Sequence, residues 1–390
     1  MPNQPITYPQ AKEKAEAIPL LVPCLPDRKA LSPYLDAIDA NRYYSNFGPL
    51  VKSLEHRLAK CFQIHTDHPM HVVTVSSATM GLELALMALE LPKGSKVVLP
   101  ALNFVAALTA TIRVGLVPVI ADIDPDVWIM TPDIAEQAAK QSGAKAVLLL
   151  ATFGQPLDTI EWANFQSRTG IRIIIDAASA FGSQWLDTAN IPVVVSMHAT
   201  KSLAAGEGGF VVSGNVDMIS RIAQLSNFGI NLDQGSGLPV GMLSHVGANA
   251  KLSEYHAAVA HASLDVWEEQ AVIRQSLFKQ YKLELEHACG EHLLWQSGIP
   301  PTSPVIFNIR LRHATQRNNL ERLAGEQGIA TRRWYQPLLH QHSPGIGPLH
   351  KLPCPNAEEI ASCLIGLPFF VSLGQEEIKR VVKLVQFAVI

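Results

Sequence analysis

The segment SMHATKSLAAGEGGFVV, residues 196 to 212, holds one lysine, Lys201, between a run with hydroxyl side chains and a run rich in glycine. The residues on both sides are apolar and typical of strands. An amine at such a junction has three simple interpretations: a solvated surface charge, a ligand for a phosphate group, or a nucleophile. The choice among them depends on which other polar side chains the fold brings close to it.

Chemically useful residues also follow other apolar runs. Ser77, Ala78 and Thr79 come after VVTV and open a helical pattern, Phe104 follows KVVLPA, and Asp176 follows RIII. The start of a helix can bind an anion, because its first N–H groups are free and the helix dipole is positive there. A possible phosphate cradle, an aromatic ring and a carboxylate therefore each stand at the end of an apolar run.

Seven apolar runs are expected to be the strands that position these residues, at 72–77, 96–101, 117–124, 146–154, 171–179, 191–198 and 208–214. Those that alternate with helical stretches indicate parallel βαβ units, and their near-continuous apolar character predicts strands buried on both faces. Ligands of such sheets bind beyond the carboxyl ends of the strands. We therefore expect the lysine, carboxylate, ring and cradle to share one edge of an α/β sheet.

Each of these residues also has a simpler interpretation. Ser77 could only cap a helix, Phe104 could fill the core, Asp176 could cap a turn, and Lys201 could be solvated. Four such residues at one edge of the sheet are better explained by one functional site than by four independent coincidences. An enzyme that uses pyridoxal 5′-phosphate (PLP) needs these parts: a lysine for covalent attachment and proton transfer, a carboxylate that keeps the pyridine nitrogen protonated, a phosphate cup and a stacking ring.

The patterns divide the chain in two. Residues 1–250 are expected to form a large α/β domain, with a proline-rich arm at 1–30 and two helices within 31–62 that are separated at SNFGP. Residues 251–390 are expected to form a smaller α+β domain. It begins with one long helix at 251–290 and continues with a strand at 304–311 and helices near 315–327 and 375–388.

The composition argues against several other classes. The 390 residues carry a formal net charge of −3 without a basic block, which disfavours nucleic acid as a partner. The five cysteines form no CxxC pair and indicate neither a disulfide framework nor a metal site. We expect a soluble cytoplasmic protein, because no signal-peptide pattern and no membrane-spanning apolar stretch occurs. A nucleotide-binding oxidoreductase is disfavoured, because no GxGxxG motif opens a helix after the first strand.

An ordered set of motifs resembles the DegT/DnrJ/EryC1/StrS family of PLP-dependent sugar aminotransferases. The motifs cover roughly residues 40 to 260 and are SNFGPLVKSLE, SSATMGLELAL, PALNFVAALTATIRVGLVPVIADIDPD, IDAASAFG, SMHATKSLAAGEGGFVV, NFGIN and GANAKLSEYHAAVA. The resemblance implies the type I fold of PLP-dependent transferases, as in aspartate aminotransferase. That fold has a large α/β/α domain with a mostly parallel seven-stranded sheet, plus a smaller C-terminal α+β domain.

The resemblance also implies roles for individual residues. Lys201 matches the lysine that binds the cofactor covalently, and Asp176 matches the partner of the pyridinium; these two are the expected catalytic residues. The other expected cofactor contacts are Ser77, Ala78, Thr79 and Ser196 at the phosphate, Phe104 on the ring, Ser179 near the phenolic oxygen, and Asn249, which matches an asparagine that reaches the cofactor of the partner subunit. A homodimer with shared sites follows from that last contact.

Three positions depart from the usual family pattern. Ala78 stands where the family often has Gly, and Ser179 stands where it usually has Gln or His. The usual NYR is NAK here, at residues 249–251. Lys201 itself is kept, whereas some relatives carry His at that place and act as dehydratases. Transamination is therefore expected, and the departures bear on the substrate and not on the cofactor.

The expected substrate is a keto sugar. In ATRRWYQPLLHQH, Arg332 suits a phosphate, and Trp334 and Tyr335 suit the face of a sugar or base. With Asn46 of RYYSNFGP and with His198, which is expected either to line the site or to pack, this segment resembles the subset that aminates C4 of nucleotide-linked 4-keto-6-deoxyhexoses. L-glutamate is the family's usual amino donor, and such sugars serve surface polysaccharides or secondary metabolites. Another ketone, such as a cyclitol or free keto sugar, and a non-catalytic PLP-binding regulator stay open as alternatives.

Overall fold

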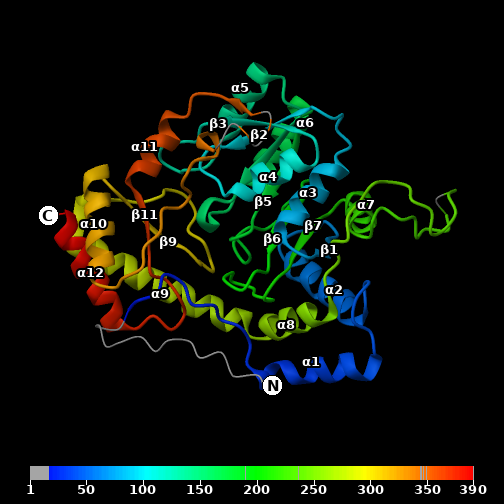
Figure 1. Cartoon of the computed structure of the whole chain (residues 1–390), viewed down its shortest axis with the longest axis horizontal. Coiled ribbons are helices and arrows are strands. Elements are labelled where there is room, and N and C mark those ends of the chain that lie inside the picture. Colours follow the sequence, from blue (N-terminus) through cyan, green and yellow to red (C-terminus); the bar gives the residue numbers. More distant parts are fainter. Residues whose placement is uncertain are drawn as a thin grey trace, which may run out of the picture.

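A sheet with helices on both of its faces forms the larger part of the molecule (Figure 1). The computed structural model describes residues 17–188, 190–235, 237–342, 345, 347 and 349–389. Within these ranges the sheet has eight strands, in the order β1-β7-β6-β5-β4-β2-β3-β10. Its strands are β1 (His71–Val75), β2 (Lys96–Pro100), β3 (Val117–Ala121), β4 (Ala146–Leu150), β5 (Arg172–Asp176), β6 (Val193–Ser196), β7 (Gly209–Ser213) and β10 (His350–Lys351).

The sheet is mostly parallel, as the sequence predicted. Among the described strands of this sheet, β7 alone runs antiparallel to its two neighbours, β1 and β6. The predicted seven strands correspond to β1–β7, and the count is corrected by β10, which pairs in parallel with β3 through His350 and Lys351. Two residues are too few to produce a periodic signal, since this strand is made by backbone pairing and not by an apolar run.

Strands buried on both faces explain the near-continuous apolar runs. Along β4, Leu148 packs into the core on one face of the sheet and Leu149 into the core on the other. One face is covered by α3 (Ala78–Ala88), α4 (Val105–Arg113), α7 (Val216–Ser226) and α11 (Pro355–Cys363). The other is covered by α2 (Pro49–Gln63), α5 (Pro132–Ser142), α6 (Thr159–Thr169) and α8 (Glu254–Asp265).

A second, antiparallel sheet lies in the C-terminal part of the described chain, with the order β11-β9-β8. Its elements are β8 (Leu293–Leu294), β9 (Phe307–Leu311) and β11 (Leu364–Leu367), with α9 (Trp267–Cys289), α10 (Ala314–Glu326) and α12 (Gln375–Val389) packed on it. Its core is separate from the two cores of the large sheet, and the Tyr281 and Phe307 rings stack in it with centroids 4.3 Å apart. A smaller α+β unit therefore accompanies the large α/β unit.

The long helix expected at 251–290 is two helices, which is a correction to the sequence prediction. The chain leaves helical geometry at Val266, with φ −114° and ψ 6°, between α8 and α9. Ala257 and Ala260 of α8 pack into a core of the large sheet, whereas Tyr281 of α9 packs into the core of the small one. No proline or glycine marks the break, so its cause is the need to bury two faces against two different cores. The division of the chain at residue 250 stays a prediction.

The N-terminal region is described from residue 17 on, so residues 1–16 of the predicted arm lie outside the described residues. Ile18 pairs with Ile329, and the two expected helices are α1 (Arg28–Asn41) and α2. The described helices include none that is long and apolar enough to cross a membrane.

The register of the strands brings the chemically useful residues to one edge. Asp176 pairs with Leu150 at the ends of β5 and β4, and Ser196 pairs with Gly209, which also pairs with Val75 at the end of β1. The last residues of β1 and β6 therefore lie on either side of the first residue of β7. This antiparallel entry of β7 between the two strand ends requires close backbone contact at Gly209.

Gly209→Ala is predicted to destabilise the protein. A Cβ at this position would lie 2.7 Å from the backbone nitrogen of Ala78 and 2.8 Å from the carbonyl oxygen of Val195, and neither can move without shifting an element. We expect the free energy of unfolding in urea to fall by about 1–3 kcal/mol. Gly325→Ala is the control, since nothing lies within 4 Å of its Cβ in α10. An equal effect of the two substitutions contradicts the close contact.

Candidate active site

A cavity of about 350 Å³ opens at this edge of the sheet. It brings together every candidate residue from the sequence except Asn46 and Asn249. Its lining includes Ser77, Ala78, Thr79, Phe104, Asp176, Ser179, Ser196, His198, Lys201, Arg332, Trp334 and Tyr335. The roles of these residues stay predictions, but their placement in one cavity is the geometry that those roles require.

Lys201 and Asp176 are the two charged groups at the centre of the site. The Lys201 Nζ donates a hydrogen bond to the Ser179 hydroxyl at 2.8 Å, and the Asp176 carboxylate accepts one from the backbone N–H of Ala178 at 2.9 Å. Burial raises the pKa of Asp176 to about 6, against the hydrogen bond from Ala178 and the charge of Lys201. Burial likewise lowers the pKa of Lys201, against the charge of Asp176. A larger share of the amine is therefore in the neutral, nucleophilic form.

The start of α3 provides an anion cradle and a helix cap at once. The Ser77 hydroxyl caps the helix by accepting a hydrogen bond from the N–H of Met80 at 3.2 Å. The next two backbone N–H groups, of Ala78 and Thr79, have no acceptor among the described residues. Across the cavity the buried Ser196 hydroxyl accepts from the N–H of His198 at 3.2 Å. The two interpretations of Ser77 are thus compatible, because the side chain caps while the following N–H groups remain available to a phosphate.

Two aromatic rings form a wall of the cavity. Phe104 stands just before α4 and is 46% exposed, so it is not core filler. Tyr335 is buried, stacks on Phe153 with centroids 5.4 Å apart, and lies 6.0 Å from the Phe104 ring. Burial raises the pKa of the Tyr335 hydroxyl. An exposed Phe104 face above a buried tyrosine suits the stacking of a flat, ring-shaped ligand.

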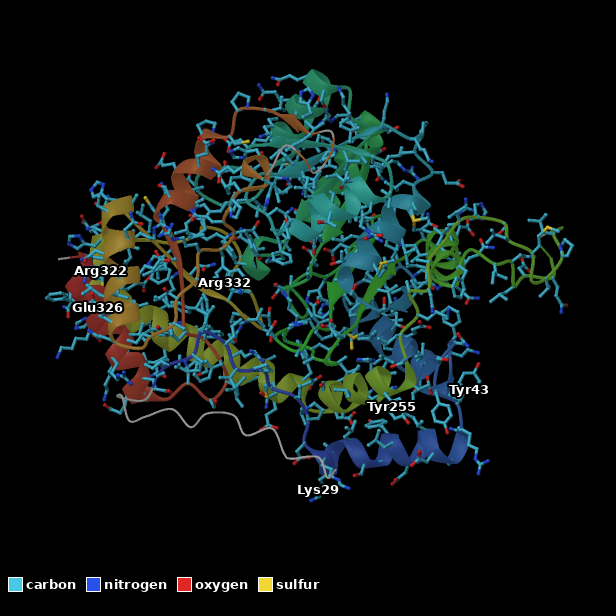
Figure 2. The ribbon with its side chains drawn as sticks, in the orientation of Figure 1. Lys29, Tyr43, Tyr255, Arg322, Glu326 and Arg332 are labelled. Carbon is cyan, nitrogen blue, oxygen red and sulfur yellow. The ribbon has the colours of Figure 1, made fainter. Side chains whose placement is uncertain are left out.

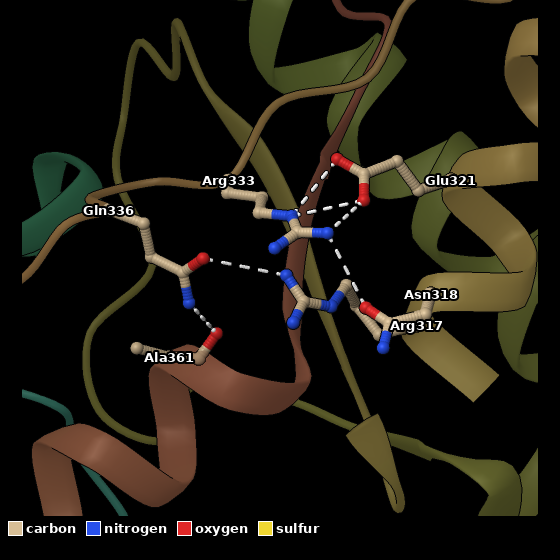
Figure 3. Close-up of polar contacts among 6 residues, drawn as sticks. All are labelled: Arg317, Asn318, Glu321, Arg333, Gln336 and Ala361. Atoms are coloured by element: carbon tan, nitrogen blue, oxygen red, sulfur yellow. Dashed lines mark hydrogen bonds and ion pairs between the residues drawn. The ribbon is translucent and has the colours of Figure 1, made fainter. Parts of the chain in front are cut away.

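The segment 332–336 reaches the cavity from the C-terminal part of the chain, and Figure 3 shows how it is held. Arg333 forms an ion pair with Glu321 of α10, and its Nε lies 3.0 Å from both carboxylate oxygens. Gln336 accepts a hydrogen bond from Arg317 at 3.5 Å and donates one to the carbonyl of Ala361 in α11. These anchors hold the backbone from which the other side chains of the segment reach the cavity.

Arg332 and Trp334 line the cavity as a pair, in contrast to Arg333. The Arg332 guanidinium lies over the Trp334 ring, 4.3 Å from its centroid. The backbone of Arg332 pairs with Gly366 of β11, and Gly366 also leaves space for Trp334, since a Cβ there would lie 2.6 Å from the indole ring. In the sequence the two arginines are neighbours and could not be told apart. The ion pair of Arg333 with Glu321 is what distinguishes it from Arg332, which lines the cavity.

Glu207 is a cavity residue that sequence reasoning missed. It belongs to the GEGG run, and its carboxylate lies 3.7 Å from the Nε2 of His198. An acidic residue within a glycine run next to the lysine is the signal that could have identified it. The turn that carries it contains two glycines with positive φ, Gly206 at 82° and Gly208 at 144°. Residues other than glycine rarely adopt such φ values.

Asn46 and Asn249 lie outside the Lys201 cavity of this chain. Asn46 lines a larger groove, of about 790 Å³, together with Lys52, Arg221 and Asn231. Asn249 forms a backbone bridge with Asn227 and accepts a hydrogen bond from the Lys251 Nζ at 2.8 Å. The expected contact of Asn249 with a cofactor and that of Asn46 with a substrate would therefore each require the cavity of a second subunit.

The residues present fit a bound PLP. The cavity offers a buried amine, a buried carboxyl group, free N–H groups at a helix start and an exposed aromatic face, which match the four chemical parts of this cofactor. PLP when bound supplies an electron sink for bonds at the α-carbon of an amino acid. Lys201 would hold it covalently, Asp176 would face its ring nitrogen, and Ala78 and Thr79 would bind its phosphate.

Solved structures of similar proteins have the same fold. DesI, whose structure was solved in the presence of its TDP-sugar product, is 30% identical, with a TM-score of 0.83 over 96% of this chain and 93% of DesI. A Bacillus cereus ATCC 10987 protein assigned to the PLP-dependent aminotransferases is 26% identical, with a TM-score of 0.86 over 95% of this chain and 100% of that one. The fold and the site define a PLP-dependent aminotransferase.

The chain belongs to the DegT/DnrJ/EryC1/StrS aminotransferase family, whose sequence model matches residues 27–386. A relative with an assigned reaction is the dTDP-4-amino-4,6-dideoxy-D-glucose transaminase of Shigella dysenteriae. It is 27% identical over 370 residues, which are 93% of this chain and 97% of that enzyme. The resemblance seen in the sequence motifs is thereby confirmed.

Asp176→Asn is predicted to stabilise the cofactor-free protein at neutral pH. A carboxyl group with a pKa of about 6 when folded and about 3.9 when unfolded binds its proton more tightly in the folded state. The wild type therefore loses stability as pH rises from about 4 to above 6, by roughly 3 kcal/mol in total, and the amide variant does not. Urea unfolding of both proteins across this range measures the difference.

The exposed Asp36→Asn in α1 is the matched control for charge removal. The stabilities of the wild type and Asp176→Asn should be similar near pH 4, move apart between about pH 4 and 6, and differ by a constant amount above that. A stability difference that is constant across this range contradicts the raised pKa of Asp176.

Proposed function

We propose that this aminotransferase moves an amino group from L-glutamate to a nucleotide-linked 4-keto-6-deoxyhexose, as part of making sugars for a surface polysaccharide or a secondary metabolite. The observation that carries the proposal is the Arg332–Trp334 pair on the wall of the Lys201 cavity. A guanidinium binds phosphate oxygens, and an indole face packs on a sugar or base. The reaction of the Shigella dysenteriae relative and the TDP-sugar product of DesI support the same substrate class.

Lys201 has two tasks in the proposed reaction. Its Nζ would hold the cofactor covalently until the amino donor displaces it. The freed amine would then take the proton from the donor's α-carbon and pass it on within the same half-reaction, and in the second half it would deliver a proton to the carbon of the keto sugar that receives the amine. A lowered pKa favours both tasks, because each needs the neutral amine. The Ser179 hydroxyl, 2.8 Å from Nζ, holds the amine within the cavity.

Asp176 controls the charge at the other end of the site. Without a partner, its burial favours the protonated form below about pH 6. A cationic ring nitrogen placed against it favours the carboxylate again, because opposite charges in a desolvated site stabilise each other. The carboxylate then keeps that nitrogen protonated, which is the state that withdraws electrons from the reacting carbon.

A homodimer is proposed because part of the expected site is missing from one chain. Asn46 and Asn249 lie outside the Lys201 cavity. The described part of the loop between α7 and α8 extends away from the body of the molecule (Figure 1). That loop exposes Leu232, Val240, Leu243 and Val246. An exposed apolar surface of this kind is typical of a protein interface, here with a second copy of the chain.

A cytoplasmic location is part of the proposal. All five cysteines lie in the described ranges, and all are free thiols. Free thiols suit a reducing compartment, where disulfides rarely persist.

A second candidate function, amination of another ketone such as a cyclitol or free keto sugar, uses the same lysine but does not need Arg332 to bind a diphosphate. A non-catalytic regulator needs no conversion by glutamate at all.

The substrate class can be tested in two steps. L-glutamate should convert the protein-bound cofactor to its amine form, which is followed by absorption, and a panel of nucleotide-linked keto sugars should then yield an aminated product by mass. No conversion by any common amino donor supports the regulator. Conversion followed by amination of only free keto sugars or cyclitols supports the second candidate.

Arg332→Ala is predicted to raise KM for the nucleotide-linked sugar about tenfold, which corresponds to ~1.4 kcal/mol, with a smaller effect on kcat. The reason is that a lost phosphate contact weakens binding without removing a reacting group. The control is Arg322→Ala, whose side chain pairs with Glu326 on α10 (Figure 2). An unchanged KM in Arg332→Ala contradicts the assigned phosphate contact.

Asn249→Ala is predicted to weaken cofactor retention across the subunit interface. Hybrid dimers of Asn249→Ala with Lys201→Ala subunits provide the test, because one site in each hybrid combines an intact Lys201 with an intact Asn249 from the other subunit. Mixing the two variants should therefore restore tight cofactor binding at that site, measured by dialysis and absorption. Asn319→Ala on α10 is the control. Absence of any recovery in the hybrids contradicts a contact between subunits.

A further inference from the structure

A second cavity lies next to the loop that carries Lys201. It has a volume of about 260 Å³ and is enclosed by the segment before α1, the end of α8 and the start of α9. Ser202 lines this cavity, whereas its neighbour Lys201 lines the first one. The two cavities are therefore separated by the backbone of a few residues, and nothing in the aminotransferase reaction requires the second.

Arg274 of α9 is the unexplained group in this cavity. Its side chain is only 5% exposed, and its Nε has no hydrogen-bond partner. No carboxylate among the residues that the structure describes forms an ion pair with it. Burial lowers its pKa, as expected for a cation held away from water. An unpaired buried charge is costly, so a guanidinium in this position indicates an anionic partner that is not part of the described chain.

The hydroxyl and thiol groups of the cavity are already engaged. The Ser263 hydroxyl donates to the carbonyl of Ala204 at 2.5 Å, the Ser202 hydroxyl to the carbonyl of Phe181 at 3.3 Å, and the Cys24 thiol to the Gln270 Oε1 at 3.6 Å. Arg274 is thus the charged donor left for a ligand, beside the side-chain amide N–H groups of Gln270. Asp27, which accepts a hydrogen bond from the N–H of Ala30 at 2.8 Å, and Glu269 also line the cavity, and their negative charges oppose binding of a doubly charged anion.

We propose that this cavity binds a small, singly charged carboxylate on the guanidinium of Arg274. The volume suits a ligand of a few heavy atoms, because pockets for drug-sized molecules begin at roughly 300 Å³. A planar carboxylate matches the fork of N–H groups that a guanidinium presents. Because Ser202 directly follows Lys201, the occupant contacts the loop that positions the catalytic amine.

Cys24 provides a local reporter for occupancy. Its thiol lines the same cavity and is exposed, whereas Cys61 is half-buried and Cys289, Cys354 and Cys363 are buried. The rate at which iodoacetamide alkylates Cys24 can be followed by peptide mass spectrometry in the full-length protein. This readout is independent of any amino-transfer activity and of the substrate proposed above.

Acetate is the probe, with chloride keeping the ionic strength constant. In the wild type, saturating acetate should slow alkylation of Cys24 about fivefold, since a ligand on Arg274 covers the thiol. Arg274→Gln should show no slowing relative to its own rate without acetate. Arg274→Lys keeps the charge and should retain a weaker effect, and Lys279→Gln, an exposed cation on the same helix, should behave as the wild type.

Three results would overturn the proposal. They are no slowing by acetate in the wild type, equal slowing in Arg274→Gln, and stronger protection by inorganic phosphate than by acetate. The last would show an anion site that does not select a singly charged carboxylate. Loss of protection in Arg274→Gln together with its retention in Lys279→Gln supports the site. If Arg274→Gln folds poorly, the weaker protection expected in Arg274→Lys is the deciding result, and full protection there contradicts the site.

Discussion

The buried pair of Lys201 and Asp176 is the constraint on which the rest of the structure depends. Burial reduces the solvation of both charges, so the pKa of the carboxyl rises to about 6 and that of the amine falls. Left alone, such a pair is a weakness in the fold. It would become useful if the PLP of this aminotransferase family, with its cationic ring nitrogen and reactive aldehyde, bound between the two groups as proposed.

The fold holds this pair in place by rigid means. Asp176 ends a central strand, and Lys201 lies in the turn between β6 and β7, whose backbones meet at Gly209. Both faces of the sheet are packed with aliphatic side chains, so the strand ends have little freedom to shift. The opposite wall comes from residues 332–336, which are anchored by Arg333 on Glu321 and by Gln336 on Ala361 (Figure 3). Functional side chains from two distant parts of the chain thus line one cavity.

Much of this could be predicted from the sequence, because apolar runs buried on both faces leave a strong local signal. The strands that carry Ser77, Asp176 and Ser196 were predicted for that reason, and their shared edge follows from parallel topology. Features decided by tertiary contact left no such signal. The break at Val266 and the two-residue strand β10 depend on packing and backbone pairing, and the opposite directions of Arg332 and Arg333 depend on Glu321. The contribution of Asn249 needs a second subunit, so it stays a prediction.

The most direct test of the central claim is to identify the residue that carries the cofactor. Borohydride reduction makes the bond between PLP and a lysine permanent, and peptide mass spectrometry then locates the added mass. The account predicts that the purified wild type carries it on Lys201 alone and that Lys201→Ala carries none, although its fold is intact by circular dichroism. A modification on another lysine, or the same modification in the Lys201→Ala variant, would contradict the account.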